Sequence, residues 1–127
     1  MKRDFTIEVY KELCRLIKES GFVTTRVCEY IREPSNGVKR AIMRHDVDSN
    51  PSNALLVARI EKENGIRSTF YFRTNSTVFD EKIIKEIYSL GHEIGYHYEV
   101  LAKCRGEIRK AMHIFREELK NLGRLFL

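Results

Sequence analysis

Ser68-Thr69-Phe70-Tyr71-Phe72 is a nearly continuous apolar and aromatic run, and it is the clearest strand signal in this sequence. Runs of this kind are typical of strands in parallel sheets, where both faces of a strand are covered. Amphipathic helix patterns lie on both sides of it. The helix before it starts at Asn50-Pro51, with Asn as the cap and Pro in the first turn, and ends at Asn64-Gly65. The helix after it ends at Gly91.

Two more apolar segments repeat this alternation. Ala41-Ile42-Met43 is expected to form a short strand that runs into Asp46 and Asp48, and residues 92–98 are expected to form another. The order strand, helix, strand, helix, strand predicts right-handed βαβ units and a parallel sheet. The expected fold class is therefore α/β.

Helices are also predicted towards both ends of the chain. Apolar residues at helical spacing indicate a helix from Val9 to Ile17 that stops at Gly21, and Thr25 is expected to cap a short second helix. A long final helix is predicted from Ile108 to Leu122.

Composition limits the classes of protein to which the chain can belong. Its 127 residues make one domain, and the 43% of apolar residues suffices for a core. No apolar stretch approaches the ~18 residues of a membrane span, and the start lacks a signal-peptide pattern. The three cysteines are too widely spaced for a disulfide framework, which favours a cytoplasmic location. The net charge of +5 is scattered without a basic stripe, so neither nucleic acid nor a membrane is an expected partner.

Potential metal ligands gather where two predicted strands end. Asp46 and Asp48 are two residues apart, so on an extended backbone their carboxylates point to the same side. Two like charges that close favour a cation between them, and a divalent metal would supply it. The alternative is that Asp48 only helps to cap the following helix, which leaves His45 and Asp46 unexplained.

His97 is the candidate metal ligand at the other strand end. By alternation it shares a face with Glu93 and Glu99, and Gly95 before it allows a close approach of backbone or substrate. A hydrogen-bonded structural role is the competing interpretation of His97, and it is the preferred one for His92. Arg44 and Arg73 could each hold a carboxylate or orient a substrate, although exposed ion pairing is the simpler use. No role is assigned to His113.

The segments that contain these residues resemble motifs of the polysaccharide deacetylases, the NodB-homology carbohydrate esterases. Gly91-His92-Glu93-Ile94-Gly95-Tyr96-His97 resembles the family's Gly-His-Glu-Ile-Gly-Asn-His string, which ends on a metal-binding His. His45-Asp46-Val47-Asp48 resembles its Thr-Phe-Asp-Asp-Gly motif, and residues 67–72 resemble its "ATFF" strand. The order and spacing agree across roughly residues 38–102.

The sequence also departs from the family's pattern. The two Asp residues of the family are adjacent, whereas Val47 separates them here. The family's second metal His follows the first by four residues, and that position is Leu101. Glu99 or a ligand from elsewhere would have to replace it. The family's later strands, with an Arg-Pro segment, an acetyl pocket and a late His, have no counterpart, so the chain resembles the amino-terminal half of an irregular (β/α) barrel.

The resemblance implies a domain organisation. Residues 1–127 form a single domain in which 38–102 is the deacetylase-like core, 1–37 an N-terminal helical extension and 103–127 a C-terminal helix at a truncation. The uncovered sheet edge and apolar tail then imply a homo-oligomer or a partner chain.

The resemblance also implies a metal-dependent hydrolase that removes an acyl group from an amino sugar or hydrolyses a related C–N bond. Asp48 and His97 would hold the metal, first of all Zn, with Co, Ni, Fe or Mn as alternatives, and Asp46 would be the general base. His45, Glu99, Arg44 and Arg73 are possible accessory residues. By itself the chain is expected to be weakly active or inactive. The alternatives are a truncated or degenerate non-catalytic homologue that assembles with another chain, and a phosphoesterase built on an Asp-x-Asp strand end.

Overall fold

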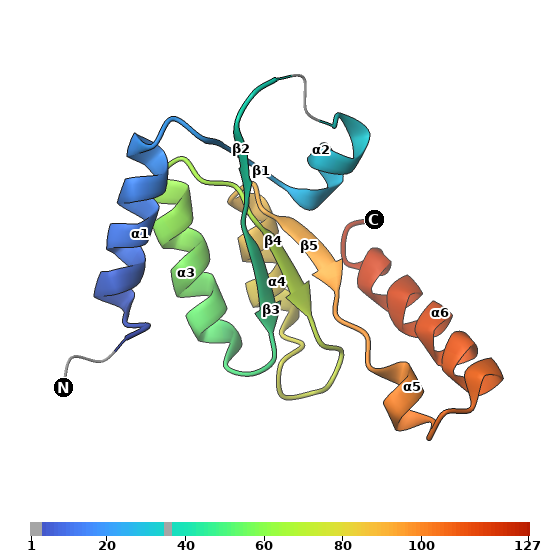
Figure 1. Cartoon of the computed structure of the whole chain (residues 1–127). Helices are drawn as coiled ribbons and strands as arrows, with labels where there is room; N and C mark the ends of the chain where they lie inside the picture. Colours follow the sequence, from blue (N-terminus) through green and yellow to red (C-terminus); the bar gives the residue numbers. More distant parts are fainter. Residues whose placement is uncertain (1–3, 35–36) are drawn as a thin grey trace.

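The computed structural model describes residues 4–34 and 37–127. This part of the chain forms five short strands and six helices (Figure 1). In chain order the elements are α1 (Ile7–Glu19), β1 (Val23–Thr25), α2 (Val27–Arg32), β2 (Arg40–Ile42), β3 (Arg44–Val47), α3 (Pro51–Glu63), β4 (Thr69–Phe72), α4 (Glu81–Ser89), β5 (Glu93–Tyr96), α5 (Val100–Lys103) and α6 (Ile108–Arg124).

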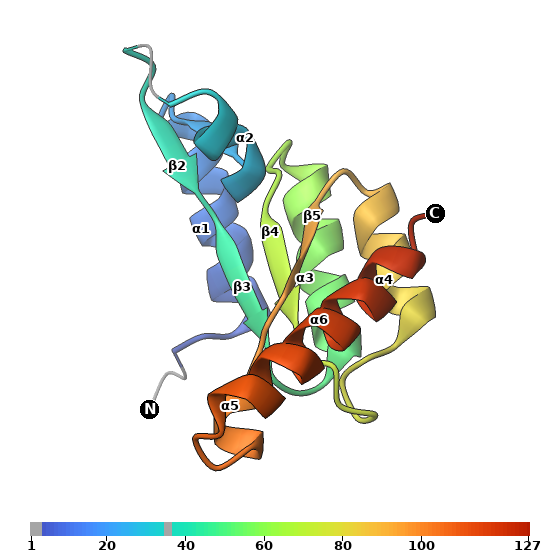
Figure 2. The ribbon, with the colours of Figure 1, turned by 90° about the vertical axis from the view of Figure 1, so that its right-hand side faces the viewer.

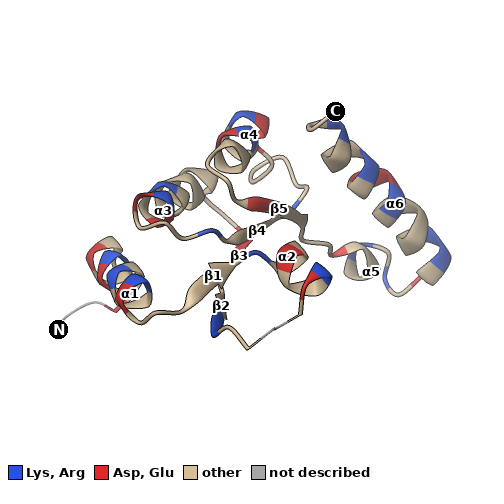
Figure 3. Ribbon diagram, turned by 90° about the horizontal axis from the view of Figure 1, so that it is seen from above, with Lys and Arg blue, Asp and Glu red and all other residues tan. Residues whose placement is uncertain are grey.

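The predicted parallel sheet is present as three strands in the order β3-β4-β5. Its first strand is Arg44–Val47, whereas Ala41 and Ile42 of the strand expected there belong to β2, which pairs with β1 instead. Both pairings are parallel, and Tyr71 in the middle strand lies opposite Asp46 on one side and Gly95 on the other. Helices α3 and α4 cover one face of this sheet, and α2 lies on the opposite side (Figure 3). The α/β class with parallel strands is confirmed.

Buried apolar residues hold the sheet to α3 and α4. Phe70 and Phe72 of β4 are fully buried, as are Ala58 of α3 and Ile84 of α4. The other face of the sheet carries polar residues, and α2 closes its start with two backbone donors. Val27 N–H donates to Thr69 Oγ1 at 3.0 Å, and Cys28 N–H donates to Glu93 Oε2 at 3.0 Å.

The N-terminal region is more than a helical extension. Strand β1 pairs in parallel with β2, so residues 23–25 add a second, two-stranded sheet. Helix α1 packs on α3 through a cluster that contains Cys14, Ile60 and Ile66. The expected cap of α2 is displaced by one residue, because Thr25 is the last residue of β1 and Arg26 is the N-cap. Apolar spacing alone did not reveal the pairing of three-residue strands.

Asn50 caps α3 as predicted, with Pro51 in the first turn. Its side-chain oxygen accepts from Asn53 N–H at 3.3 Å, and its backbone adopts a left-handed φ of 45°. Asn tolerates this conformation better than most residues. The turn that leaves β3 is therefore set by local sequence.

The C-terminal region forms a short helix and a long one. Helix α5 was not predicted, and α6 packs against it through Val100, Cys104 and Ala111. Figure 2 shows α6 running obliquely across the β5 side of the molecule. Its contacts to the strand include the hydrogen bond from the Tyr96 hydroxyl to Glu118.

The sheets in the described part of the chain are small and open. No barrel is formed by residues 4–34 and 37–127, so the barrel that the resemblance implies is not seen there. None of the helices in those two ranges is both long enough and apolar enough to cross a membrane.

Candidate functional site

Asp48 and His97 lie together at the carboxyl edge of the three-stranded sheet. His97 Nε2 is 3.4 Å from Asp48 Oδ1, with the His97 side chain 23% exposed and that of Asp48 62% exposed. The sequence suggested that the strands preceding them would be neighbours, but β4 lies between β3 and β5. His97 reaches this position through its backbone N–H, which donates to the Phe72 carbonyl at 2.9 Å.

Arg73, at the end of the middle strand, joins the pair to Glu99. Its Nε and Nη2 donate to Glu99 Oε2 at 3.0 and 2.7 Å, and its Nη1 donates to the Asp48 carbonyl at 3.3 Å. Two of the predicted accessory residues therefore belong to the same cluster. Asp48, Arg73, His97 and Glu99 are called the edge cluster below.

The donor set of the edge cluster fits a divalent cation in type but supplies few ligands. A carboxylate oxygen and an imidazole nitrogen at one point suit Zn, Co, Fe or Mn. No group of three or more His, Cys, Asp or Glu residues within the described ranges could hold a metal ion. Glu99 is the other carboxylate of the edge cluster, and Arg73 occupies one of its oxygens.

The second nitrogen of His97 is unusual for a metal ligand. Nδ1 is buried and has no hydrogen-bond partner among the described residues. Metal-bound imidazoles normally donate their other N–H to a carboxylate, a carbonyl or a water, which fixes the ring. Among the described residues, Asp48 is the polar side chain that approaches the ring.

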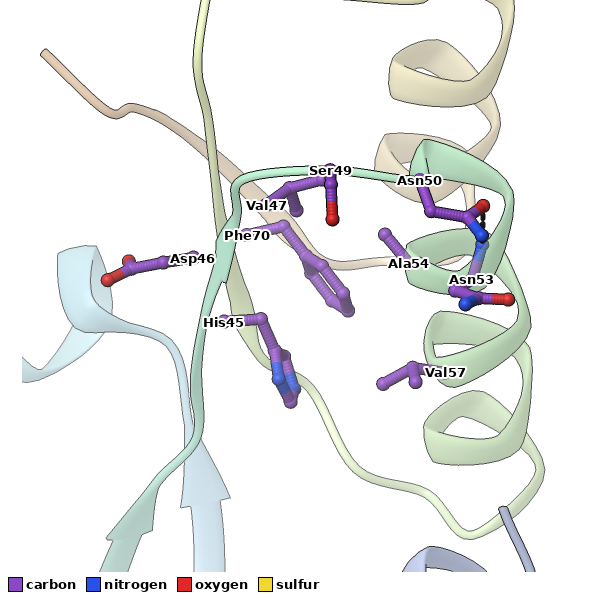
Figure 4. A pocket seen from close by; sticks show the side chains of 9 residues that line it. All are labelled: His45, Asp46, Val47, Ser49, Asn50, Asn53, Ala54, Val57 and Phe70. Carbon is purple, nitrogen blue, oxygen red and sulfur yellow. Dashed lines mark hydrogen bonds between the residues drawn. The ribbon is translucent and has the colours of Figure 1, made fainter. Parts of the chain in front are cut away.

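Asp46 has a different partner from Asp48. Its Oδ1 accepts from Arg44 Nε at 3.1 Å, and the guanidinium of Arg44 lies 4.3 Å from the centre of the Tyr71 ring. Figure 4 shows its side chain pointing away from those of His45 and Phe70, as strand alternation requires. Arg44 therefore acts as an exposed ion-pairing residue that positions Asp46.

Gly95 makes room for an aromatic ring. A Cβ atom at this position would lie 2.4 Å from Tyr71 Cδ1, far inside van der Waals contact. The close approach that the sequence suggested for backbone or substrate is made by Tyr71. This ring lies against Gly95, which is itself half-buried.

His45 points to the helix-covered face and belongs to a buried polar cluster. Its Nε2 is 2.5 Å from Oε1 of Glu61, a residue of α3 with 0% of its surface exposed. The Tyr10 hydroxyl of α1 donates to the same oxygen, and Ser68 Oγ donates to Glu61 Oε2 at 2.6 Å. These four residues are called the Glu61 cluster below.

Sequence reasoning missed Glu61, because a Glu in an amphipathic helix is normally assigned to solvent. Burial works to raise the pKa of Glu61, but the hydrogen bond and charge of His45, with the Ser68 and Tyr10 hydroxyls, lower it below its ordinary value. The only sequence signal was position, since Glu61 directly follows the buried Ile60.

His92 is structural, in agreement with the sequence. It is fully buried, accepts from Ser68 N–H at Nδ1 (3.1 Å), and donates from Nε2 to the Ala58 carbonyl at 2.9 Å. These two bonds require the neutral ring. Burial lowers the pKa of His92 accordingly.

No protein-family model, no curated protein and no solved structure matches this chain. The polysaccharide deacetylase resemblance therefore rests on the residues quoted above.

Proposed function

We propose that this chain carries the metal-binding half-site of a hydrolase that resembles the polysaccharide deacetylases. The observation that supports it is the 3.4 Å approach of His97 Nε2 to Asp48 Oδ1 across the end of β4. Sites in parallel α/β proteins form at this edge of the sheet. The proposed substrate class is an acylated amino sugar or a compound with a related non-peptide C–N bond.

Each residue of the site has a role in this proposal. Asp48 and His97 hold a divalent metal, Zn first, which when bound polarises an acyl carbonyl and lowers the pKa of a water. Arg73 fixes the Asp48 backbone and holds Glu99 in reach as a further ligand or substrate contact. Asp46, paired with Arg44, accepts the proton of the attacking water.

Metal binding is tested by isothermal titration with Zn, Co and Ni. We expect one site in the wild-type chain and a loss of affinity of tenfold or more in His97→Ala. His113→Ala is the matched control, because His113 is exposed on α6, away from the sheet edge. If the wild-type and His97→Ala proteins bound the metal with equal affinity at a stoichiometric site, His97 would not be a metal ligand.

The role of Asp46 is tested by Asp46→Asn in an acetate-release assay on chito-oligosaccharides. This change keeps the shape of the side chain and removes the base, so turnover should fall by roughly two to four orders of magnitude while metal still binds. An active enzyme that tolerates the change would have its base elsewhere, with Asp48 as the first replacement to test.

A second candidate function is that of a non-catalytic chain that assembles with itself or with a partner. It is favoured by the shortage of metal ligands in the described residues and by an apolar surface on α5 and α6. Leu101, Ile108 and Met112 are exposed there. Surfaces of this kind favour association.

Light scattering after size-exclusion chromatography, run beside the acetate-release assay, separates the two candidates. Dimers or larger species without metal-dependent turnover would support the second. A 15.0 kDa monomer with brisk metal-dependent turnover would support the first and contradict the expected weakness of the isolated chain.

A further inference from the structure

The Glu61 cluster fixes which nitrogen of His45 is available to react. A carboxylate only accepts hydrogen bonds, so the short contact to Glu61 Oε1 requires the proton of His45 on Nε2. Nδ1 is then the atom that can take up or return a proton. Pairing of an imidazole with a buried carboxylate is how many enzymes orient a histidine base.

The imidazole lies where two hollows meet. One hollow, of about 220 Å³, lies between β3 and the start of α3, and it presents the polar side chains of Ser49, Asn50 and Asn53 (Figure 4). Asp46 also lines this hollow, but its carboxylate points away from His45 and Phe70. The other, of about 350 Å³, runs along α1 and is mainly apolar, with Ile7, Val9 and Leu13 among its lining residues. His45 and Val57 line both hollows.

The polar hollow and the apolar hollow together suit an amphiphilic ligand. An apolar chain fits the α1 hollow, an uncharged hydroxylated head fits the amide and hydroxyl groups at the start of α3, and the bond that joins them lies beside the imidazole. Ligand sites typically combine apolar walls with a few placed polar groups in this way. The side chain of His45 is 22% exposed, so it is accessible from the hollows while Glu61 is not.

We propose that His45 is the general base of a second site, separate from the edge cluster, which hydrolyses short-chain acyl esters of a polyol. His45 Nδ1 takes a proton from water as the water oxygen bonds to the acyl carbon. The C–O bond then breaks, its electron pair leaves with the polyol oxygen, and Nδ1 returns the proton to that oxygen. Glu61 is a positioning residue that keeps Nε2 protonated throughout, so no other reactant is needed.

The test measures the rate at which the full chain hydrolyses glycerol monobutyrate and glycerol monoacetate. A metal chelator is present throughout. Two extra methylene groups in the apolar hollow are worth about 0.8 kcal/mol each, so the butyrate should be hydrolysed roughly tenfold faster. His45→Gln should lower the rate of hydrolysis at least tenfold. His113→Gln, a change at an exposed residue of α6, should leave the rate unchanged. The chelator keeps this test independent of the metal-dependent proposal.

A second variant covers the possibility that His45→Gln does not fold. Val57→Phe leaves the Glu61 cluster intact and fills the junction of the two hollows, so it should also lower the rate at least tenfold. Leu56→Phe is its control, because Leu56 is the adjacent residue of α3 and lines neither hollow. Circular dichroism establishes that both variants are folded.

The protonated nitrogen of His45 can be read from long-range proton–nitrogen NMR spectra of the wild-type chain. We expect the Nε2–H form of the neutral ring, and the Nδ1–H form would overturn the proposal. An inactive wild-type chain, activity that disappears with the chelator, or full activity in Val57→Phe would each overturn it as well.

Discussion

Two histidine–carboxylate pairs each take one member from residues 45–48 but lie in opposite environments. His45 and Glu61 meet at 2.5 Å with the carboxylate fully buried, whereas His97 and Asp48 meet at 3.4 Å with the carboxylate 62% exposed. The same two functional groups therefore serve two purposes. A buried carboxylate must be fully hydrogen-bonded or the fold pays a large penalty, while an exposed one can exchange its partner for water, a metal or a substrate.

The largest expected effect is on stability at the buried pair. Glu61→Ala leaves His45, Tyr10 and Ser68 without their common partner, and breaking a buried charge network from one side typically costs about 3–5 kcal/mol. Urea unfolding followed by circular dichroism measures the free energy of unfolding. Exposed ion pairs contribute less than about 1 kcal/mol. If Glu61→Ala lowered the free energy of unfolding by no more than that, the buried pair would be no more important for stability than the exposed one.

A smaller decrease in the free energy of unfolding is expected for Ser68→Ala, which removes one of the hydrogen-bond donors to Glu61. Ser68 is fully buried, and a hydrogen bond to a charged group contributes about 1.5–3 kcal/mol. Ser49→Ala is a matched control outside the Glu61 cluster. Equal free energies of unfolding for both variants would mean that the cluster depends on His45 and Tyr10 alone.

Acid should affect the buried pair through Glu61. The pKa of this carboxyl is lower in the folded chain than its ordinary value of 4.5. Its contribution to stability is therefore complete above that value and is lost as the pH falls through the folded pKa. Unfolding free energies measured over an acid series should decline more steeply for the wild-type chain than for Glu61→Gln, and parallel curves would contradict the assignment.

The smallest effect is expected at the exposed pair without metal. Asp48→Ala should change the free energy of unfolding by less than about 1 kcal/mol, as for other exposed ion pairs. If the edge cluster binds Zn, saturation at about 100 times the dissociation constant should stabilise the wild-type chain by about 2.7 kcal/mol and the variant by much less. Thermal unfolding with and without Zn tests this, and equal shifts for both proteins would place the metal elsewhere.

Much of the fold followed from the sequence, because the signals were local. The run at residues 68–72 and the Asn50-Pro51 helix start indicated strand and helix directly, and both are present. The meeting of Asp48 with His97 followed from the rule that parallel strands place their carboxyl ends at one edge. These inferences needed no knowledge of packing.

The remaining features depended on contacts that the sequence does not display. Glu61 looks like any solvent-facing Glu of an amphipathic helix until α1 and the sheet surround it. The pairing of β1 with β2 joins segments of three residues, too short for a periodic pattern. Strand alternation alone implies that His45 and Asp46 point to opposite faces, as they do in Figure 4.

The bond from Tyr10 to Glu61 also bears on the order of events during synthesis. The two residues are 51 positions apart, so α1 leaves the ribosome well before the partner of its Tyr10 hydroxyl has been made. Until α3 and β4 follow, that hydroxyl lacks this partner, and the apolar side of α1 lacks Ile60 and Ile66. During synthesis α1 is therefore exposed to aggregation for a time. The exposure ends when α3 has been made and packs against it.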